Sequence, residues 1–77
     1  MYKQDTSISY YRNKANLSQQ KLADILDIPR TTMSFYENKR QYPSIEEAEQ
    51  IAEILQVPIG SLYSQEELAL MRARSLR

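Results

Sequence analysis

The sequence predicts an all-α domain of five short helices, with a short sixth helix allowed near the C-terminal end. Among its 77 residues there is a single glycine, and apolar residues seldom alternate with polar ones, which disfavours hairpins and sheets. Apolar residues instead recur three and four positions apart in successive segments, which is the spacing of one face of a helix. Ser18, Ser44 and Ser64 each stand before such a segment, and serine is a favoured helix N-cap. We expect a folded domain over residues 1–63 and a tail over residues 64–77.

The composition excludes several classes of functional site. The chain has neither cysteine nor histidine, which rules out disulfides, most zinc sites and every Ser–His or Cys–His catalytic arrangement. We therefore expect a protein that is not an enzyme and that binds no metal and no cofactor. No window approaches the roughly 18 apolar residues of a membrane span, and residues 1–9 lack the apolar core of a secretion signal. The expected location is the cytoplasm, without a membrane partner.

The net charge is zero, but the charges are segregated along the chain. Residues 1–43 hold seven basic and four acidic side chains, a balance of +3. Residues 44–67 hold six glutamates and no basic residue, and the last ten residues hold three arginines. A polarised molecule of this kind can present a basic face to phosphates although its mean charge is nil. On charge alone, a scatter of solvated side chains explains the pattern equally well.

The first three helices are expected over residues 6–15, Gln19–Leu26 and Arg30–Glu37. In the first of them, Ile8 and Tyr11 lie three positions apart and face inward. The buried stripe of the second helix consists of Leu22, Ala23 and Leu26.

The third helix has one apolar side, formed by Met33 and Tyr36. The turn before it is too short to let the second and third helices lie antiparallel, and the small Ala23 and the apolar Ile28 allow them to cross closely. The third helix should therefore protrude, and a protruding helix with a polar face fits the major groove of DNA. The side opposite Met33 carries Arg30, Thr31, Ser34 and Phe35.

The remaining helices are predicted from their starting signals. Ser44 and Glu47 form a capping box that opens a fourth helix. A short fifth helix is expected to begin at Pro58 and to run through Tyr63. Ser64 is followed three residues later by Glu67, which repeats the capping-box pattern. The apolar stripe of the fourth helix consists of Ile45, Ala48, Ile51, Ala52 and Leu55.

Residues 17–40 read LSQQKLADILDIPRTTMSFYENKR, and this stretch closely resembles the helix-turn-helix of the phage repressor and Cro family, also called the XRE family. The resemblance continues through Pro43-Ser44 and Val57-Pro58 and covers about residues 7–63. It implies a five-helix, lambda-repressor-like DNA-binding fold. The chain departs from the family at three positions where glycine is common, which are Asn16, Asp27 and Lys39.

The resemblance also implies roles for individual residues. The candidate base-contacting residues are Arg30, Thr31, Ser34 and Phe35, and the candidate phosphate-contacting residues are Gln19, Asn38, Lys39, Arg40 and Tyr42. Arg12 and Glu37 resemble a family pair that ties the first helix to the end of the third, so we expect a structural ion pair. Other interpretations stay open: Phe35 as a core or interface aromatic, and Arg30, Lys39 and Arg40 as solvated charges.

The function implied is that of a sequence-specific regulator of transcription, acting as a repressor on double-stranded DNA through the helix Arg30–Glu37. We expect a homodimer and no small-molecule effector. The alternative is a protein-interaction module of the antitoxin or adaptor type, with weak or no specific DNA binding. The predicted dimer interface consists of Ile59, Leu62, Tyr63, Leu68 and Met71.

Overall fold

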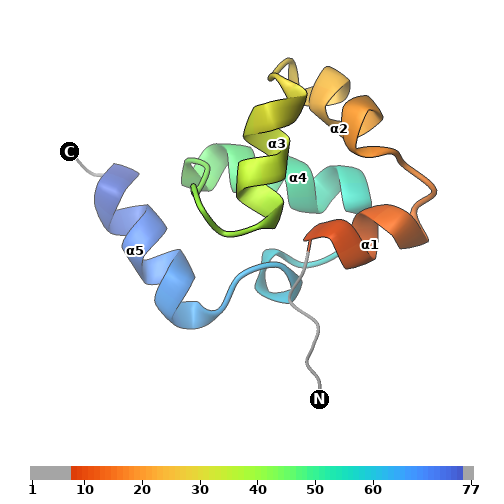
Figure 1. Cartoon of the computed structure of the whole chain (residues 1–77). Coiled ribbons are helices and arrows are strands. Elements are labelled where there is room, and N and C mark those ends of the chain that lie inside the picture. Colours follow the sequence, from red (N-terminus) through yellow and green to blue (C-terminus); the bar gives the residue numbers. More distant parts are fainter. Residues whose placement is uncertain (1–7, 76–77) are drawn as a thin grey trace.

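The computed structural model describes residues 8–75, and Figure 1 shows their path. Within this range the chain forms five α-helices and one 3-10 turn, and it contains no strand. None of these helices is long and apolar enough to cross a bilayer. The elements are α1 (Ile8–Lys14), α2 (Gln19–Leu26), α3 (Arg30–Glu37), α4 (Ile45–Leu55), η1 (Ile59–Ser61) and α5 (Gln65–Ser75).

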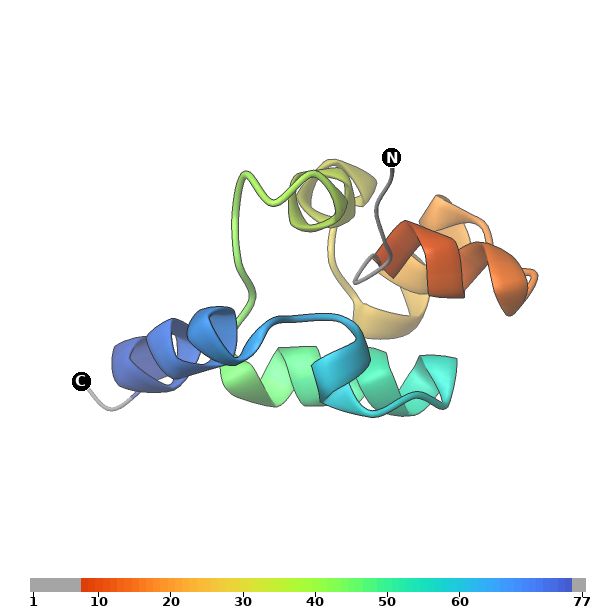
Figure 2. The same cartoon turned by 90° about the horizontal axis from the view of Figure 1, so that it is seen from below.

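The helices are arranged so that α3 crosses α4 in a separate layer (Figures 1 and 2). Figure 2 shows α3 on one side of the molecule, with α4 and α5 on the other. α1 and α2 lie together at one end of the molecule, whereas α5 lies at the opposite end (Figure 1). This arrangement leaves one side of α3 free of covering helices.

A single core joins all of these elements. Leu22, Met33 and Ile51 are fully buried in it, as the helical spacing predicts, and Leu26 is half-buried against it. Pro43 is also buried, where the chain turns from α3 into α4. The largest side chains with less than 2 % exposure are Tyr63, Ile8, Leu22, Met33, Ile51 and Leu62.

The segment after α4 differs from its prediction. The expected fifth helix is only the three-residue 3-10 turn η1, after which Leu62 and Tyr63 enter the core. Gly60 disfavours a continuous helix there. The 11-residue α5 begins instead after the Ser64 cap and packs Leu68 and Met71 into the same core. α5 is therefore part of the folded body.

Four helices are followed within two residues by a residue in the left-handed conformation, and none of these residues is glycine. Asn16, Asp27, Lys39 and Gln56 have φ between 59° and 60°. Asn and Asp tolerate this region better than other side chains. The first three are the positions at which the family often has glycine, so the chain keeps the turn geometry while changing the residue type.

Candidate nucleic-acid interface

The turn between α2 and α3 fixes how α3 is presented. The Oγ atom of Ser18 accepts a hydrogen bond from the Lys21 N–H at 2.9 Å and caps α2. At the other end the Ile28 N–H donates to the Ala23 carbonyl at 3.0 Å, which closes α2 over the left-handed Asp27. Pro29 then starts α3 in an extended conformation. Ala23 is fully buried, and because its side chain is small, α2 and α3 can approach closely at this point.

The outer face of α3 is open to solvent. Arg30 and Thr31 are exposed, Ser34 is half-buried, and Phe35 is 45 % exposed. Met33, on the opposite side, is fully buried. An exposure of 45 % is not that of a core aromatic.

A chain of hydrogen bonds runs from this face into the protein. Arg30 donates from its guanidinium NH1 to the Oε1 atom of Gln19 at 3.1 Å. Gln19 in turn donates from Nε2 to the Oε1 atom of Glu37 at 3.0 Å. Glu37 then accepts from Arg12. The candidate base contact and the candidate phosphate contact are thus positioned by one network that spans α1, α2 and α3.

Arg12 and Glu37 form the inner end of that network. Arg12 Nε lies 2.6 Å from Glu37 Oε2, and the two side chains are 12 % and 7 % exposed. Arg12 NH1 also donates to the Leu17 carbonyl at 2.8 Å, which fixes the end of the α1–α2 connection, next to the Ser18 cap. The structure therefore brings together the two residues that the sequence pairs, although they are 25 positions apart.

The α3–α4 loop, residues 38–44, carries four of the candidate phosphate contacts, and they differ in their surroundings. Asn38 and Arg40 are exposed, and Arg40 has no side-chain partner among residues 8–75. The Arg40 N–H donates to the Phe35 carbonyl at 2.9 Å, which ties the loop to the end of α3. The loop thus presents Arg40, at the end of α3, as an exposed cation with no side-chain partner within the described residues 8–75.

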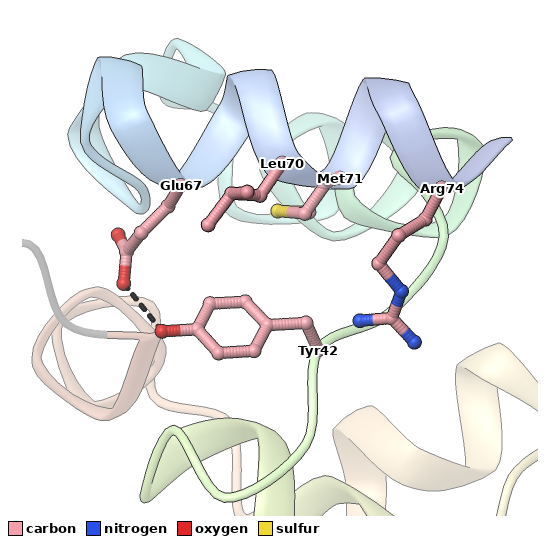
Figure 3. Close-up of a pocket in the computed structure, with 5 residues that line it drawn as sticks. All are labelled: Tyr42, Glu67, Leu70, Met71 and Arg74. Atoms are coloured by element: carbon pink, nitrogen blue, oxygen red, sulfur yellow. Dashed lines mark hydrogen bonds between the residues drawn. The ribbon is translucent and has the colours of Figure 1, made fainter. Parts of the chain in front are cut away.

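Lys39 and Tyr42 of the same loop are half-buried and contact α5. Lys39 Nζ lies 2.9 Å from Glu67 Oε2 and 4.8 Å from the centre of the Tyr63 ring. The hydroxyl of Tyr42 donates to the same carboxylate at 2.7 Å (Figure 3). The expected availability of these two residues for phosphates is therefore not what the structure shows, because a carboxylate of the same chain already holds both.

Glu67 is stabilised in its charged form. Burial alone disfavours the carboxylate, but the hydrogen bonds from Tyr42, from the Ser64 N–H and from Lys39 outweigh this effect and lower the pKa of Glu67. The hydrogen bond to Glu67 in turn raises the pKa of Tyr42 to about 12. Sequence analysis identified Glu67 only as a capping residue, because nothing in its spacing indicates a contact with a residue 28 positions away.

A second carboxylate, Glu47, was assigned only as the capping partner of Ser44. It accepts a hydrogen bond from the Tyr36 hydroxyl at 2.7 Å and so connects the inner side of α3 to α4. Burial, together with this contact, raises the pKa of Tyr36.

The residues predicted to form a dimer interface lie mostly inside one chain. Leu62, Tyr63, Leu68 and Met71 are between 0 % and 7 % exposed, and Ile59 is half-buried against the core. Their apolar character is explained by α5 and η1 packing on the rest of the domain. These side chains are therefore not available to a second chain in this structure.

The comparisons with known proteins agree with this geometry. Residues 8–62, which include α1 to α4 and η1, match a helix-turn-helix family of DNA-binding regulatory domains. Comparison with curated proteins and with solved structures found no match. With most of its length matched and with the crossed α2–α3 pair in place, the chain belongs to the XRE-type helix-turn-helix family of DNA-binding proteins.

Proposed function

We propose that this protein is a sequence-specific transcription regulator that represses by occupying double-stranded DNA, with α3 in the major groove. The observation that carries the proposal is the solvent-open face of α3, on which Arg30 is held by Gln19. A helix of this kind fits the width of the major groove, where base edges present a readable pattern of donors and acceptors.

The proposed roles follow from the chemistry of each side chain. The contact with Gln19 uses one guanidinium nitrogen of Arg30, and the remaining donors can reach a guanine O6/N7 pair. Thr31 and Ser34 carry hydroxyls for base edges, whereas Phe35 can only pack on an apolar group such as a thymine methyl. The proposed phosphate contacts are the exposed Asn38 and Arg40, together with Gln19, whose amide is held between Arg30 and Glu37.

The test is to select bound duplexes from a random DNA pool and to repeat the selection with single variants. Arg30→Ala is expected to relax preference at one base pair and to weaken binding by about 1–3 kcal/mol. Phe35→Ala is expected to reduce preference for a thymine step. Arg72→Ala is the matched control, because Arg72 is exposed on α5, at the other end of the molecule from α2 (Figure 1). Selection profiles that are unchanged in the α3 variants would contradict the assignment.

A protein that binds no duplex of any sequence would instead favour the protein-interaction module. In that case the exposed Phe35 would be the anchor for a protein partner, since aromatic side chains are enriched in interface hot spots.

We also propose that the regulator is a homodimer that binds a two-fold symmetric site, and the exposed face of α5 supports this. Leu70 is 68 % exposed at the middle of α5 and borders a hollow of about 190 Å³ (Figure 3). Glu66 precedes Leu70 by four residues and Arg74 follows it by four, so all three share one helix face. Two such helices packed antiparallel would place each Glu66 beside the partner's Arg74, with Leu70 at the axis. Two copies would present two α3 helices, as two half-sites about 34 Å apart require.

Sedimentation equilibrium at micromolar protein tests the dimer. Leu70→Asp is expected to give a monomer, because it places two carboxylates at the axis. Ile25→Asp is the matched control: Ile25 is 49 % exposed but lies on α2, far from α5 (Figure 1). A wild-type protein that stays monomeric, alone and on a full operator, would rule out this interface.

A further inference from the structure

Two side chains of the α3–α4 loop converge on one carboxylate of the C-terminal helix. Lys39 Nζ donates to both oxygens of Glu67, at 3.1 and 2.9 Å, and the Tyr42 hydroxyl donates to Oε2 at 2.7 Å. An ammonium and a hydroxyl that meet at an anion are the donors that would otherwise bind a phosphate. Glu67 lies outside residues 8–62, so this contact is made from beyond the part of the chain that matches the family.

We propose that Glu67 is a positioning residue for DNA binding, which withholds Lys39 from the phosphates and leaves Arg40 as the cation that the loop presents. This inference rests on the proposed function, because it concerns the same surface. It adds a residue of α5 to the determinants of affinity.

The surroundings of Lys39 leave few of its hydrogen-bond donors for an external anion. Besides the two Glu67 oxygens, its ammonium lies 3.5 Å from the Leu62 carbonyl, so three acceptors of the chain surround its three donors. It also lies 4.8 Å from the centre of the Tyr63 ring and 5.8 Å from that of Tyr42, where cation–π attraction adds to the contact. A phosphate would have to replace a carboxylate that is already in place.

Arg40 is different in each of these respects. Its side chain is exposed and has no partner among residues 8–75, and its backbone is tied to Phe35 at the end of α3. Lys39 takes the left-handed conformation, with φ of 59°, so that the chain turns between the two residues. Adjacent basic residues are thus assigned to different partners, one to Glu67 and the other to DNA.

Salt dependence separates the two assignments. Each phosphate neutralised by a cation adds about 0.9 to the slope of log K against log salt concentration. Over a change from about 50 to 200 mM salt, one contact therefore changes the binding constant by about threefold. Lys39→Ala is expected to leave the slope unchanged, whereas Arg40→Ala is expected to lower it by about 0.9.

Glu67→Gln tests the role of the carboxylate directly. It keeps the size and capping ability of the side chain but removes the charge, so Lys39 becomes available and the slope is expected to rise by about 0.9. The double variant Glu67→Gln/Lys39→Ala is expected to return to the wild-type slope, since the effect acts through Lys39. Glu49→Gln is the matched control, because it removes the same charge from an exposed residue of α4 with no partner among residues 8–75. Circular dichroism confirms that each variant is folded.

Two results would overturn the inference: a slope that falls by about 0.9 in Lys39→Ala, or equal slopes in Glu67→Gln and Glu49→Gln. If Glu67→Gln does not fold, Lys39→Ala and Arg40→Ala decide the question by themselves. If the wild-type protein shows no salt-dependent binding to any duplex, the proposed function fails. The same variants are then compared on heparin, a polyanion whose binding requires no base recognition, and the same slopes decide whether Glu67 withholds Lys39.

Discussion

Gln56 ends α4 with φ of 60°, a conformation that a side chain makes unfavourable by about 1–2 kcal/mol. Its side chain is exposed and forms no hydrogen bond within residues 8–75. Gln56→Gly is therefore expected to raise the free energy of unfolding by about 1 kcal/mol, measured by urea denaturation.

The control for this change is Glu53→Gly, at an exposed position inside the same helix. There the glycine should lower stability by about 1 kcal/mol, because the helical conformation gains nothing from its freedom. If both variants lost stability, the left-handed turn at Gln56 would be unstrained.

Tyr63 is 1 % exposed, and its hydroxyl has no hydrogen-bond partner within the part of the chain that the structure describes. An unsatisfied buried hydroxyl costs about 1–3 kcal/mol. Tyr63→Phe is therefore expected to stabilise the protein by about 1 kcal/mol in urea denaturation. Tyr36→Phe should have the opposite effect, since the Tyr36 hydroxyl donates to Glu47. A loss of stability in Tyr63→Phe would show that its hydroxyl has a partner in solution.

At the scale of elements, α5 carries two leucines with opposite environments. Leu68 is 7 % exposed and Leu70 is 68 % exposed, because residues two positions apart point to different faces of a helix. Leu68→Ala is expected to lower the free energy of unfolding by about 2–4 kcal/mol, and Leu70→Ala by less than about 0.5 kcal/mol. The measurement is chemical denaturation at a protein concentration low enough to avoid association. Equal and small effects would mean that α5 does not dock on the core.

The ends of α2 and α3 could be predicted from local chemistry, whereas the role of α5 could not. Ser18 caps α2, and Asp27 and Pro29 separate it from α3, so each boundary has a short-range cause. The apolar residues of α5 were assigned to a second chain because a periodic pattern shows that a face is covered but does not identify what covers it. The expected fifth helix is shortened to the three-residue η1, because Gly60 lowers the helix propensity of the segment.

One part of the candidate site could likewise be predicted from the sequence, and another part could not. The outer face of α3 follows from helical periodicity alone, because Met33 fixes the buried side. The anchoring of Lys39 by Glu67 depends on how α5 returns across the domain after α4, and no short-range signal specifies that path.

At the scale of the whole molecule, the glutamates of α4 and the outer face of α3 lie on different sides (Figure 2). The exposed glutamates of α4 lie opposite its buried face, and the core separates them from the outer face of α3 with Arg30. A net charge of zero thus coexists with two exposed arginines, Arg30 and Arg40, at α3 and the loop after it, and local positive charge attracts phosphate.

Three tyrosines make the free energy of unfolding depend on pH in the alkaline range. Burial raises the pKa of Tyr36 and of Tyr63, and the hydrogen bond to Glu67 raises that of Tyr42 to about 12. Above the ordinary tyrosine pKa of about 10 the folded chain therefore holds protons that the unfolded chain has lost. The stabilisation is complete below about pH 10 and is lost as the pH rises through the folded pKa values.

Tyrosinate absorbance, recorded against pH for the folded protein and in urea, measures this effect. We expect part of the folded signal to appear only near pH 12 and above, and Tyr42→Phe to remove the component near pH 12. Identical titration curves in the two conditions would contradict the buried positions of these hydroxyls.

The network from Arg12 to Arg30 also means that the reading surface is ordered before DNA arrives. Gln19 and Arg30 hold each other in the free protein, so complex formation freezes fewer side-chain rotamers, each of which would otherwise oppose association by about 0.5–1.5 kcal/mol. The side chains of such a preordered surface cannot change conformation to fit a mismatched duplex. Discrimination between correct and incorrect sites then depends on complementarity alone, and incorrect complexes are rejected by rapid dissociation.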